Sequence, residues 1–210
     1  MIIIKFRHDI DPLEFDWDNT IDKCFDGMDL HRALLQGKNL SKSSFVKTSL
    51  RGAEFEGADF SYANLDSCCL AVSYGDASNF SNAIITNAIL SGAKLTNANL
   101  EDADFSNSHI GAKFTNSNLQ NTVWVKAIFS GDEFDNANLK NADFSEANFT
   151  EATTVGGKKI PVSFKGANLC GADFSTCINI KNAKFKGAIY DDQTKWSQEF
   201  NPKRKGAIKV

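Results

Sequence analysis

Large apolar residues recur at every fifth position through most of this chain. In the stretch 88–105 they are Leu90, Leu95, Leu100 and Phe105. A small residue lies two positions before each of them, and Gly, Asn or Asp is common two positions after. This period of five constrains the fold more than any other feature of the sequence.

Neither standard element uses such a period. In a helix, five residues advance by about 500°, so successive apolar side chains would be spread around the axis by steps of about 140°. In a flat strand, positions five apart point to opposite faces. The pattern is useful only if the chain turns a corner every five residues, so that the large residue and the small residue before it both point inward.

Four such sides close a square coil, and successive coils stack at about 4.8 Å, the spacing of hydrogen-bonded strands. A single repeat cannot bury its own apolar residue, so an array of this kind has to be long. The sequence predicts an all-β solenoid of roughly eight four-sided coils, about 40 Å long. Its predicted core includes Leu50, Phe60, Phe80, Leu90, Leu100, Phe105, Trp124 and Phe144.

The run resembles the pentapeptide-repeat family, whose consensus is A(D/N)Lxx. Matches or near matches are Ala53 to Phe55, Ala58 to Phe60, Ala63 to Leu65, Ala98 to Leu100, Ala137 to Leu139, Ala142 to Phe144 and Ala167 to Leu169. The resemblance implies a right-handed quadrilateral β-helix with no pore and no cofactor.

Residues 1–24 precede the array. The stretch 2–6 could form a short strand. Pro12 follows an Asp, as at the start of a helix, and Leu13, Trp17 and Ile21 then recur at helical spacing. We expect a short helical cap over the first coil, because the end of a solenoid exposes unpaired backbone and apolar residues. A helix that binds a partner is the alternative.

The array is expected to span residues 25–190. Its rhythm falters at Gly75, and the centre Phe114 comes one residue early. The segment 154–163 departs most, since it contains Gly156, Gly157, Lys158, Lys159 and a proline. A buried unpaired Lys is costly, so the segment either loops out or turns one distorted side to solvent.

If this segment is counted as two nominal sides, every fourth centre falls in one vertical column. This count places Leu169 in the column of Phe149, Phe164 in the column of Phe144, and Phe174 in the column of Phe134. The four columns then stay apolar along the array except at Gly75, Thr154 and Lys159. The count therefore treats the ten residues as part of the coil.

Residues 191–210 form the predicted C-terminal cap and basic tail. The segment 190–202 resembles the tail of bacterial, notably cyanobacterial, pentapeptide-repeat proteins, where a Tyr-Asp-x-x-Thr stretch leads to an aromatic residue and then to Phe-x-Pro. We expect Trp196 and Phe200 to cover the last coil. The basic cluster 203–205 is interpreted as a frayed, solvated terminus.

The sequence offers little sign of catalysis. His8, His31 and His109 are far apart, and the five cysteines have no CxxC spacing, so packing explains the cysteines better than metal or redox roles. Catalysis also needs convergent polar groups in a concavity, which a filled coil lacks. We expect no enzyme and no catalytic, cofactor-binding or metal-binding residues.

The start of the sequence is too short for a signal h-region, and no run is long enough to span a bilayer, so a cytoplasmic location is expected. The formal net charge of −3 gives no basic footprint for nucleic acid. A protein partner and no membrane insertion are therefore expected, for a monomer or an end-to-end dimer.

Two functions remain. The first is a non-enzymatic structural or protein-interaction module, in which Gly156, Gly157, Lys158 and Lys159 contact an unknown partner unless their segment is neutral drift. The second is implied by the family resemblance, since some members mimic DNA and protect DNA gyrase. That role implies a strongly acidic rod, whereas outward acids here share their sides with lysines.

Overall fold

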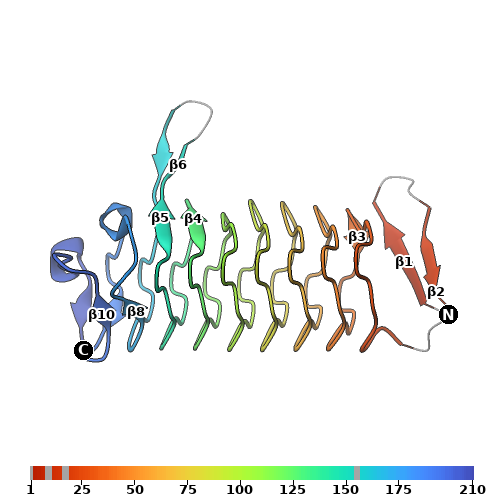
Figure 1. Ribbon diagram of the computed structural model, residues 1–210, viewed down its shortest axis with the longest axis horizontal. Coiled ribbons are helices and arrows are strands. Elements are labelled where there is room, and N and C mark those ends of the chain that lie inside the picture. Colours follow the sequence, from red (N-terminus) through yellow and green to blue (C-terminus); the bar gives the residue numbers. More distant parts are fainter. Residues whose placement is uncertain (1, 8–10, 16–18, 154–156) are drawn as a thin grey trace.

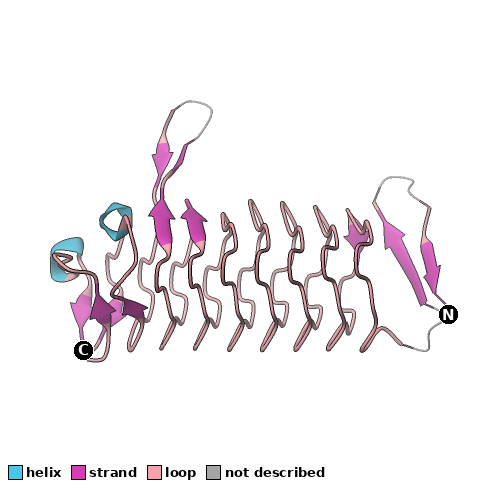
Figure 2. Cartoon of the chain, viewed as in Figure 1, coloured by secondary structure: helices cyan, strands magenta, loops and turns pink. Residues whose placement is uncertain are grey.

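The computed structural model describes residues 2–7, 11–15, 19–153 and 157–210. They form an elongated coil with the two chain ends at opposite tips (Figure 1), and most of the coil consists of short turns and bridges (Figure 2). The strands are β1 (Ile2–Phe6), β2 (Leu13–Phe15), β3 (Ala33–Leu34), β4 (Ile128–Ser130), β5 (Asn148–Thr150), β6 (Ala152–Thr153), β7 (Lys159–Ile160), β8 (Asp173–Phe174), β9 (Ile189–Tyr190), β10 (Lys195–Trp196) and β11 (Ile208–Lys209). Two 3-10 turns are η1 (Ile180–Asn182) and η2 (Lys203–Lys205).

Each side of the coil pairs with the corresponding side of the next turn. Single-residue parallel bridges join positions twenty residues apart along much of the chain, such as Asn79 and Asn99. The strands stay short because the chain turns a corner after every fifth residue. A repeat of twenty residues equals four sides of five, so the predicted solenoid is confirmed. One column of outward residues contains Cys24, Ser44, Asn64, Ile84, Asp104, Val123, Asp143 and Asp173.

The centre of each side points into the coil and fills it. All eight residues named above as the predicted core are completely buried. Aromatic rings stack between adjacent coils, with ring centroids 4.2 Å apart for Phe105 and Trp124 and 4.6 Å apart for Phe144 and Phe174. The buried indole N–H of Trp124 donates to the Thr122 hydroxyl at 2.8 Å, so this polar group is satisfied inside the core.

The residue two positions after each centre usually has a left-handed backbone. Its φ is +58° at Asn97 and +59° at Asp102. Gly, Asn and Asp tolerate this conformation better than other residues, which explains their recurrence in the sequence. Val72 has φ +51° at the same position, where a β-branched side chain is strained.

In the shortened side at 111–114, a buried carboxylate accepts a hydrogen bond that a backbone carbonyl accepts in regular sides. In regular sides the amide of the small residue donates to the carbonyl of the preceding centre. Here the Ala112 amide donates instead to Asp132 Oδ1, and the Ser130 amide donates to Asp132 Oδ2, both at 2.8 Å. Burial raises the pKa of Asp132 to about 7, and it outweighs the lowering effect of these two hydrogen bonds.

The predicted N-terminal helix is wrong for the described residues. Residues 13–15 form strand β2, which pairs antiparallel with β1, and β1 in turn pairs antiparallel with β3 of the first coil. The expected strand at residues 2–6 is confirmed. A short isolated helix is marginal in water, whereas the open edge of the first coil offers backbone partners. Trp17 lies outside the described residues.

A cluster of polar groups also attaches this hairpin to the array. Arg7 forms an ion pair with Glu54, and its backbone amide donates to the Arg32 carbonyl at 3.1 Å. The other carboxylate oxygen of Glu54 accepts a hydrogen bond of 2.6 Å from Gln36. Glu54 points outward from the coil, yet it is only 8% exposed because the N-terminal segment covers it.

At the other end, the last strands continue the array. β10 pairs parallel with β8, and β11 pairs parallel with β9. Trp196 stacks on Phe174 with centroids 5.1 Å apart, and Phe200 also packs against the core, as expected. The interpretation of residues 203–205 as frayed is wrong, because they form η2 and lead into a paired strand.

Candidate interaction surface

The segment between β5 and the centre Phe164 leaves the coil as a β-hairpin. β6 and β7 pair antiparallel, with Ala152 opposite Ile160, and Figure 1 shows the hairpin projecting from the side of the rod. Looping out was one of the two alternatives for residues 154–163. Among the described residues, the projecting part consists of β6 and of residues 157–161 with β7, whereas residues 162 and 163 belong to the coil.

The hairpin corrects the predicted columns beyond residue 150. Ser163 bridges to Glu133, and Phe134 donates its amide to the Ser163 carbonyl at 2.7 Å. Phe164 therefore stacks on Phe134, with centroids 5.1 Å apart, and does not continue the column of Phe144 as predicted. The columns of Phe149 and Phe134 were likewise not continued as predicted: Leu169 lies in the column of Leu139 and Phe174 in that of Phe144. The described residues of the insertion contribute no side to the coil.

The five-residue repeat continues across the base of the hairpin. If residues 152–161 are omitted, Phe149 is followed by Thr150, Glu151, Val162, Ser163 and Phe164, which restores the spacing of five. Val162 is buried at the small inward position of its side. The insertion is therefore a complete unit added at one corner.

A glycine allows the hairpin to leave the coil at this corner. A Cβ added at Gly131 would lie 2.8 Å from the Cβ of Ala152 and 3.2 Å from the carbonyl oxygen of Ile160. Gly131 also has φ +72°. A larger residue at position 131 would clash with the base of the hairpin. The sequence around Gly131 did not predict this contact.

The predicted contact residues lie on the second half of the hairpin or outside the described residues. Lys159 is in β7, its side chain is 71% exposed, and its Nζ is 3.1 Å from Glu151. Lys158 is exposed beside it, and Gly157 has φ +77° with no atom within 4 Å of an added Cβ. Gly156 lies outside the described residues. An exposed ion pair of this kind contributes at most about 1 kcal/mol, so Lys159 can exchange Glu151 for another acid.

An exposed apolar strip leads toward the hairpin. It consists of Ile89 and Ile128, 46% and 36% exposed, with His109 bridged between them in the same column. Ile128 begins β4, which pairs with β5 immediately before the hairpin. The period of five predicted that these positions point outward, but it gave no reason for isoleucine there.

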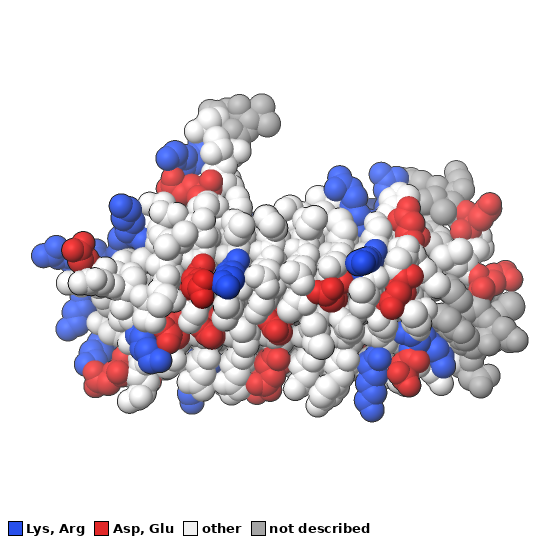
Figure 3. Space-filling model, viewed as in Figure 1, with Lys and Arg blue, Asp and Glu red and all other residues white. Residues whose placement is uncertain are grey.

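Charges on the sides of the rod alternate in sign. Figure 3 shows acidic and basic side chains interspersed over the face in view. Several pair between adjacent coils, with nitrogen–oxygen distances of 3.0 Å for Lys113–Glu133 and 2.8 Å for Lys195–Asp173. The described residues therefore present acids that are partly neutralised by neighbouring lysines.

The described residues contain no group of three or more His, Cys, Asp or Glu side chains that could hold a metal ion. Cys68 and Cys177 are buried at small inward positions, and burial raises the pKa of both thiols. The described part of the chain also has no helix that is long and apolar enough to cross a membrane.

Comparison with known proteins identifies the repeats. The family model described as "Pentapeptide repeats" matches in eight copies, over residues 24–61, 39–71 and 76–111. Residues 24–71 and 76–111 therefore match pentapeptide repeats, as the resemblance of the sequence to that family indicated. A comparison with curated protein sequences gave no match.

Two solved structures are similar along nearly the whole chain. One is HetL from the cyanobacterium Nostoc sp. strain PCC 7120, a pentapeptide-repeat protein involved in heterocyst differentiation regulation. The two sequences are 22% identical, the match covers 90% of this chain and 86% of HetL, and the TM-score is 0.61. The other is QnrB1, a plasmid-mediated fluoroquinolone resistance protein. The two sequences are 18% identical, the match covers 90% of this chain and 91% of QnrB1, and the TM-score is 0.57. At these identities the likeness shows the shared solenoid fold alone.

Proposed function

We propose that this chain is a non-enzymatic protein-interaction scaffold whose contact element is the hairpin formed by residues 152–161. The observation that carries the proposal is that the described residues of this segment, 152–153 and 157–161, lie outside an array that closes around it. Most positions of a solenoid are committed to filling, turning or hydrogen bonding. A projecting unit is free of those constraints, so its residues are available for recognition.

The chemistry of the hairpin favours an acidic protein surface with an apolar centre. Lys158 and Lys159 supply positive charge, and Ile160 is 39% exposed at the base. The strip of Ile89 and Ile128 extends this apolar character along the rod. A partner that lies against the rod and reaches the hairpin could contact both.

Binding to DNA gyrase as a DNA mimic is the second candidate. A projecting loop on a rod of this kind and the structural likeness to QnrB1 favour it. The pairing of Lys113 with Glu133 and of Lys126 with Glu146 counts against it, because DNA mimicry needs a continuous acidic stripe. A supercoiling assay with purified gyrase and a fluoroquinolone tests this candidate, and unchanged inhibition in the presence of the protein would exclude it.

Removal of residues 152–161 tests the proposed contact element without altering the array. This deletion joins Glu151 to Val162 and keeps the five-residue spacing, so we expect the same or a higher melting temperature. A protein captured by the wild type from the native host should be lost with the deletion, and its purified form should bind the wild type in calorimetry.

A second variant changes the strip and leaves the hairpin intact. The double substitution Ile89→Asn and Ile128→Asn replaces its two exposed isoleucines. If the deletion variant binds the purified partner as tightly as wild type does, the hairpin is not the contact element. Loss of binding in the strip variant alone would place the contact on the strip.

A further inference from the structure

The column that contains Ile178 stops before the others at the C-terminal end. Ile178 bridges to Asn148: its amide donates to the Ala147 carbonyl at 2.9 Å, and its carbonyl accepts from the Phe149 amide at 3.1 Å. The other columns continue, since Lys184 bridges to Ser163, β10 covers β8 and β11 covers β9. After Trp196 the chain moves away over residues 197–201, so the side above Ile178 is missing.

The backbone at this edge has two groups that face the missing side. In a trans peptide the C=O and N–H point in opposite directions. Because the Ile178 amide and carbonyl both point to the preceding coil, the Cys177 carbonyl and the Asn179 amide point away from it. Among the described residues neither group has a hydrogen-bond partner in that direction. In a parallel pair of strands, a carbonyl and an amide placed two residues apart in this way bind the amide and the carbonyl of one residue on the neighbouring strand.

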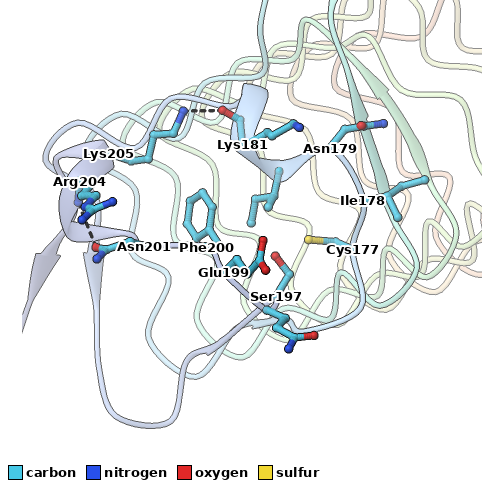
Figure 4. Close-up of a pocket in the computed structure, with 12 residues that line it drawn as sticks. Cys177, Ile178, Asn179, Lys181, Ser197, Glu199, Phe200, Asn201, Arg204 and Lys205 are labelled. Atoms are coloured by element: carbon cyan, nitrogen blue, oxygen red, sulfur yellow. Dashed lines mark hydrogen bonds between the residues drawn. The ribbon is translucent and has the colours of Figure 1, made fainter.

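A cavity of about 480 Å³ lies next to this edge (Figure 4). It falls within the range of ligand sites, roughly 300–1,000 Å³. Cys177 and Ile180 are buried in its floor, and Phe200 stands half-buried on the opposite wall. η1 lies beside the cavity and follows an inserted residue in this side, since Phe174 and Ile180 are six positions apart.

The rim of the cavity is basic. Lys181, Arg204 and Lys205 line it, against a single acid, Glu199. The Lys205 ammonium group donates to the Lys181 carbonyl, which holds the two lysines near each other. An anionic group beside an apolar one would therefore be complementary to this site.

We propose that this cavity binds an extended acidic peptide, which adds to the Ile178 edge as the missing side of the coil. One peptide residue donates its amide to the Cys177 carbonyl and accepts from the Asn179 amide. The next residue, large and apolar, enters the cavity between Ile180 and Phe200. A following acid lies near Lys181 and Arg204. Strand addition of this kind obtains affinity from main-chain hydrogen bonds and specificity from the pocket. The site is separate from the hairpin of residues 152–161.

Binding can be measured with a fluorescent peptide of sequence Gly-Ala-Asp-Phe-Glu-Gly, acetylated and amidated at its ends. We expect saturable binding to the wild type, and binding weakened roughly tenfold by the exposed charge reversal Arg204→Glu. Lys140→Glu, an exposed reversal on a distant side, is the matched control and should leave affinity unchanged. Replacing the peptide Phe by Gly, or methylating the Asp amide nitrogen, should abolish binding.

Amide exchange gives a second readout that charge alone would not change. On binding, the Asn179 amide should become protected from exchange with solvent. Absence of binding at millimolar peptide, or binding that Arg204→Glu leaves unchanged, would overturn the proposal. So would equally tight binding of 3-phenylpropionate, because the site would then take small acids. Concentration-dependent dimerisation that blocks the peptide and is lost in Arg204→Glu would assign the site to a second copy instead.

Discussion

Gly75 occupies a position where every regular side has a large inward residue. Its backbone is ordinary for the array: the Gly75 amide donates to the Lys94 carbonyl at 2.8 Å. A Cβ added there would lie 2.0 Å from Cε2 of Phe55 and 2.9 Å from Cδ2 of Leu95. The ring of Phe55, one coil below, therefore fills the space at both levels.

This arrangement predicts strong coupling between the two positions. Gly75→Ala should cost about 1–3 kcal/mol, because overpacking forces the Phe55 ring out of place. Phe55→Leu should cost less than the ~3–5 kcal/mol typical of truncating a buried Phe to Ala. In the Phe55→Leu background the added methyl group enters vacated space, so Gly75→Ala should become neutral or stabilising. The coupling free energy should be about 1–3 kcal/mol.

Urea unfolding of the wild type, both single variants and the double variant measures this coupling as changes in the free energy of unfolding. Gly37→Ala is the matched control, since Gly37 has φ +63° and no atom within 4 Å of an added Cβ. Its cost, about 1–2 kcal/mol from the left-handed backbone, should be the same with Phe or Leu at position 55. Additive costs for Phe55→Leu and Gly75→Ala would refute the shared-space account.

Three further predictions concern single positions. Phe105→Ala should cost about 3–5 kcal/mol in urea unfolding, since it empties space beside Trp124; Thr96→Ala, at an outward position, should cost less than about 0.5 kcal/mol, and similar losses would mean that the assigned inward and outward positions are wrong. Val72→Asn should stabilise the chain by about 1 kcal/mol in the same assay, because Asn tolerates φ +51° better than Val does; an unchanged or lower stability would show that the backbone there is not strained. Burial raises the pKa of Asp132 from its ordinary value of 3.8 to about 7, so the folded state binds more protons between these values, and the free energy of unfolding should fall as pH rises from about 4 to about 7; Asp132→Asn should remove this slope, and a slope that persists would assign it to other groups.

Most of the fold could be predicted from the period of five. It identified the inward residues, such as Leu100 and Trp124, because burial of a large side chain is decided by its position in the repeat. It also identified the turn residues, since only a few residue types tolerate the left-handed backbone at Asn97. Both are local requirements that each repeat meets on its own, so a single sequence reveals them.

The period of five could not predict the phase of the array beyond the hairpin, that is, which side of the preceding coil each later side stacks on. All four columns are apolar, so a shift by two sides places Phe164 on Phe144 instead of Phe134 with no loss of apolar contact. The information that fixes the phase is the contact between Gly131 and the base of the hairpin. That contact joins residues about one coil apart and has no periodic signature.

The N-terminal cap and the site of Asp132 were missed for a related reason. The spacing of Leu13 and Ile21 allows a helix, but Leu13 lies in a strand because β1, which is itself held by β3 of the first coil, offers an edge. Asp132 occupies an inward position where Ala is usual, and this alone could have marked it as a buried acid. Its partner, the Ala112 amide, becomes available only because a side twenty residues earlier is one residue short.

The position of the hairpin outside the array is the central claim, and engineered disulfides test it most directly. Glu133 and Ser163 face each other as bridged residues of adjacent coils, at the separation of neighbouring strands, which a disulfide can span. The pair Asp143 and Ser163 would be neighbours only if residues 152–161 formed two sides of the coil. We expect Glu133→Cys with Ser163→Cys to oxidise to a disulfide mapped by mass spectrometry, and Asp143→Cys with Ser163→Cys to stay reduced; the reverse result would contradict the account.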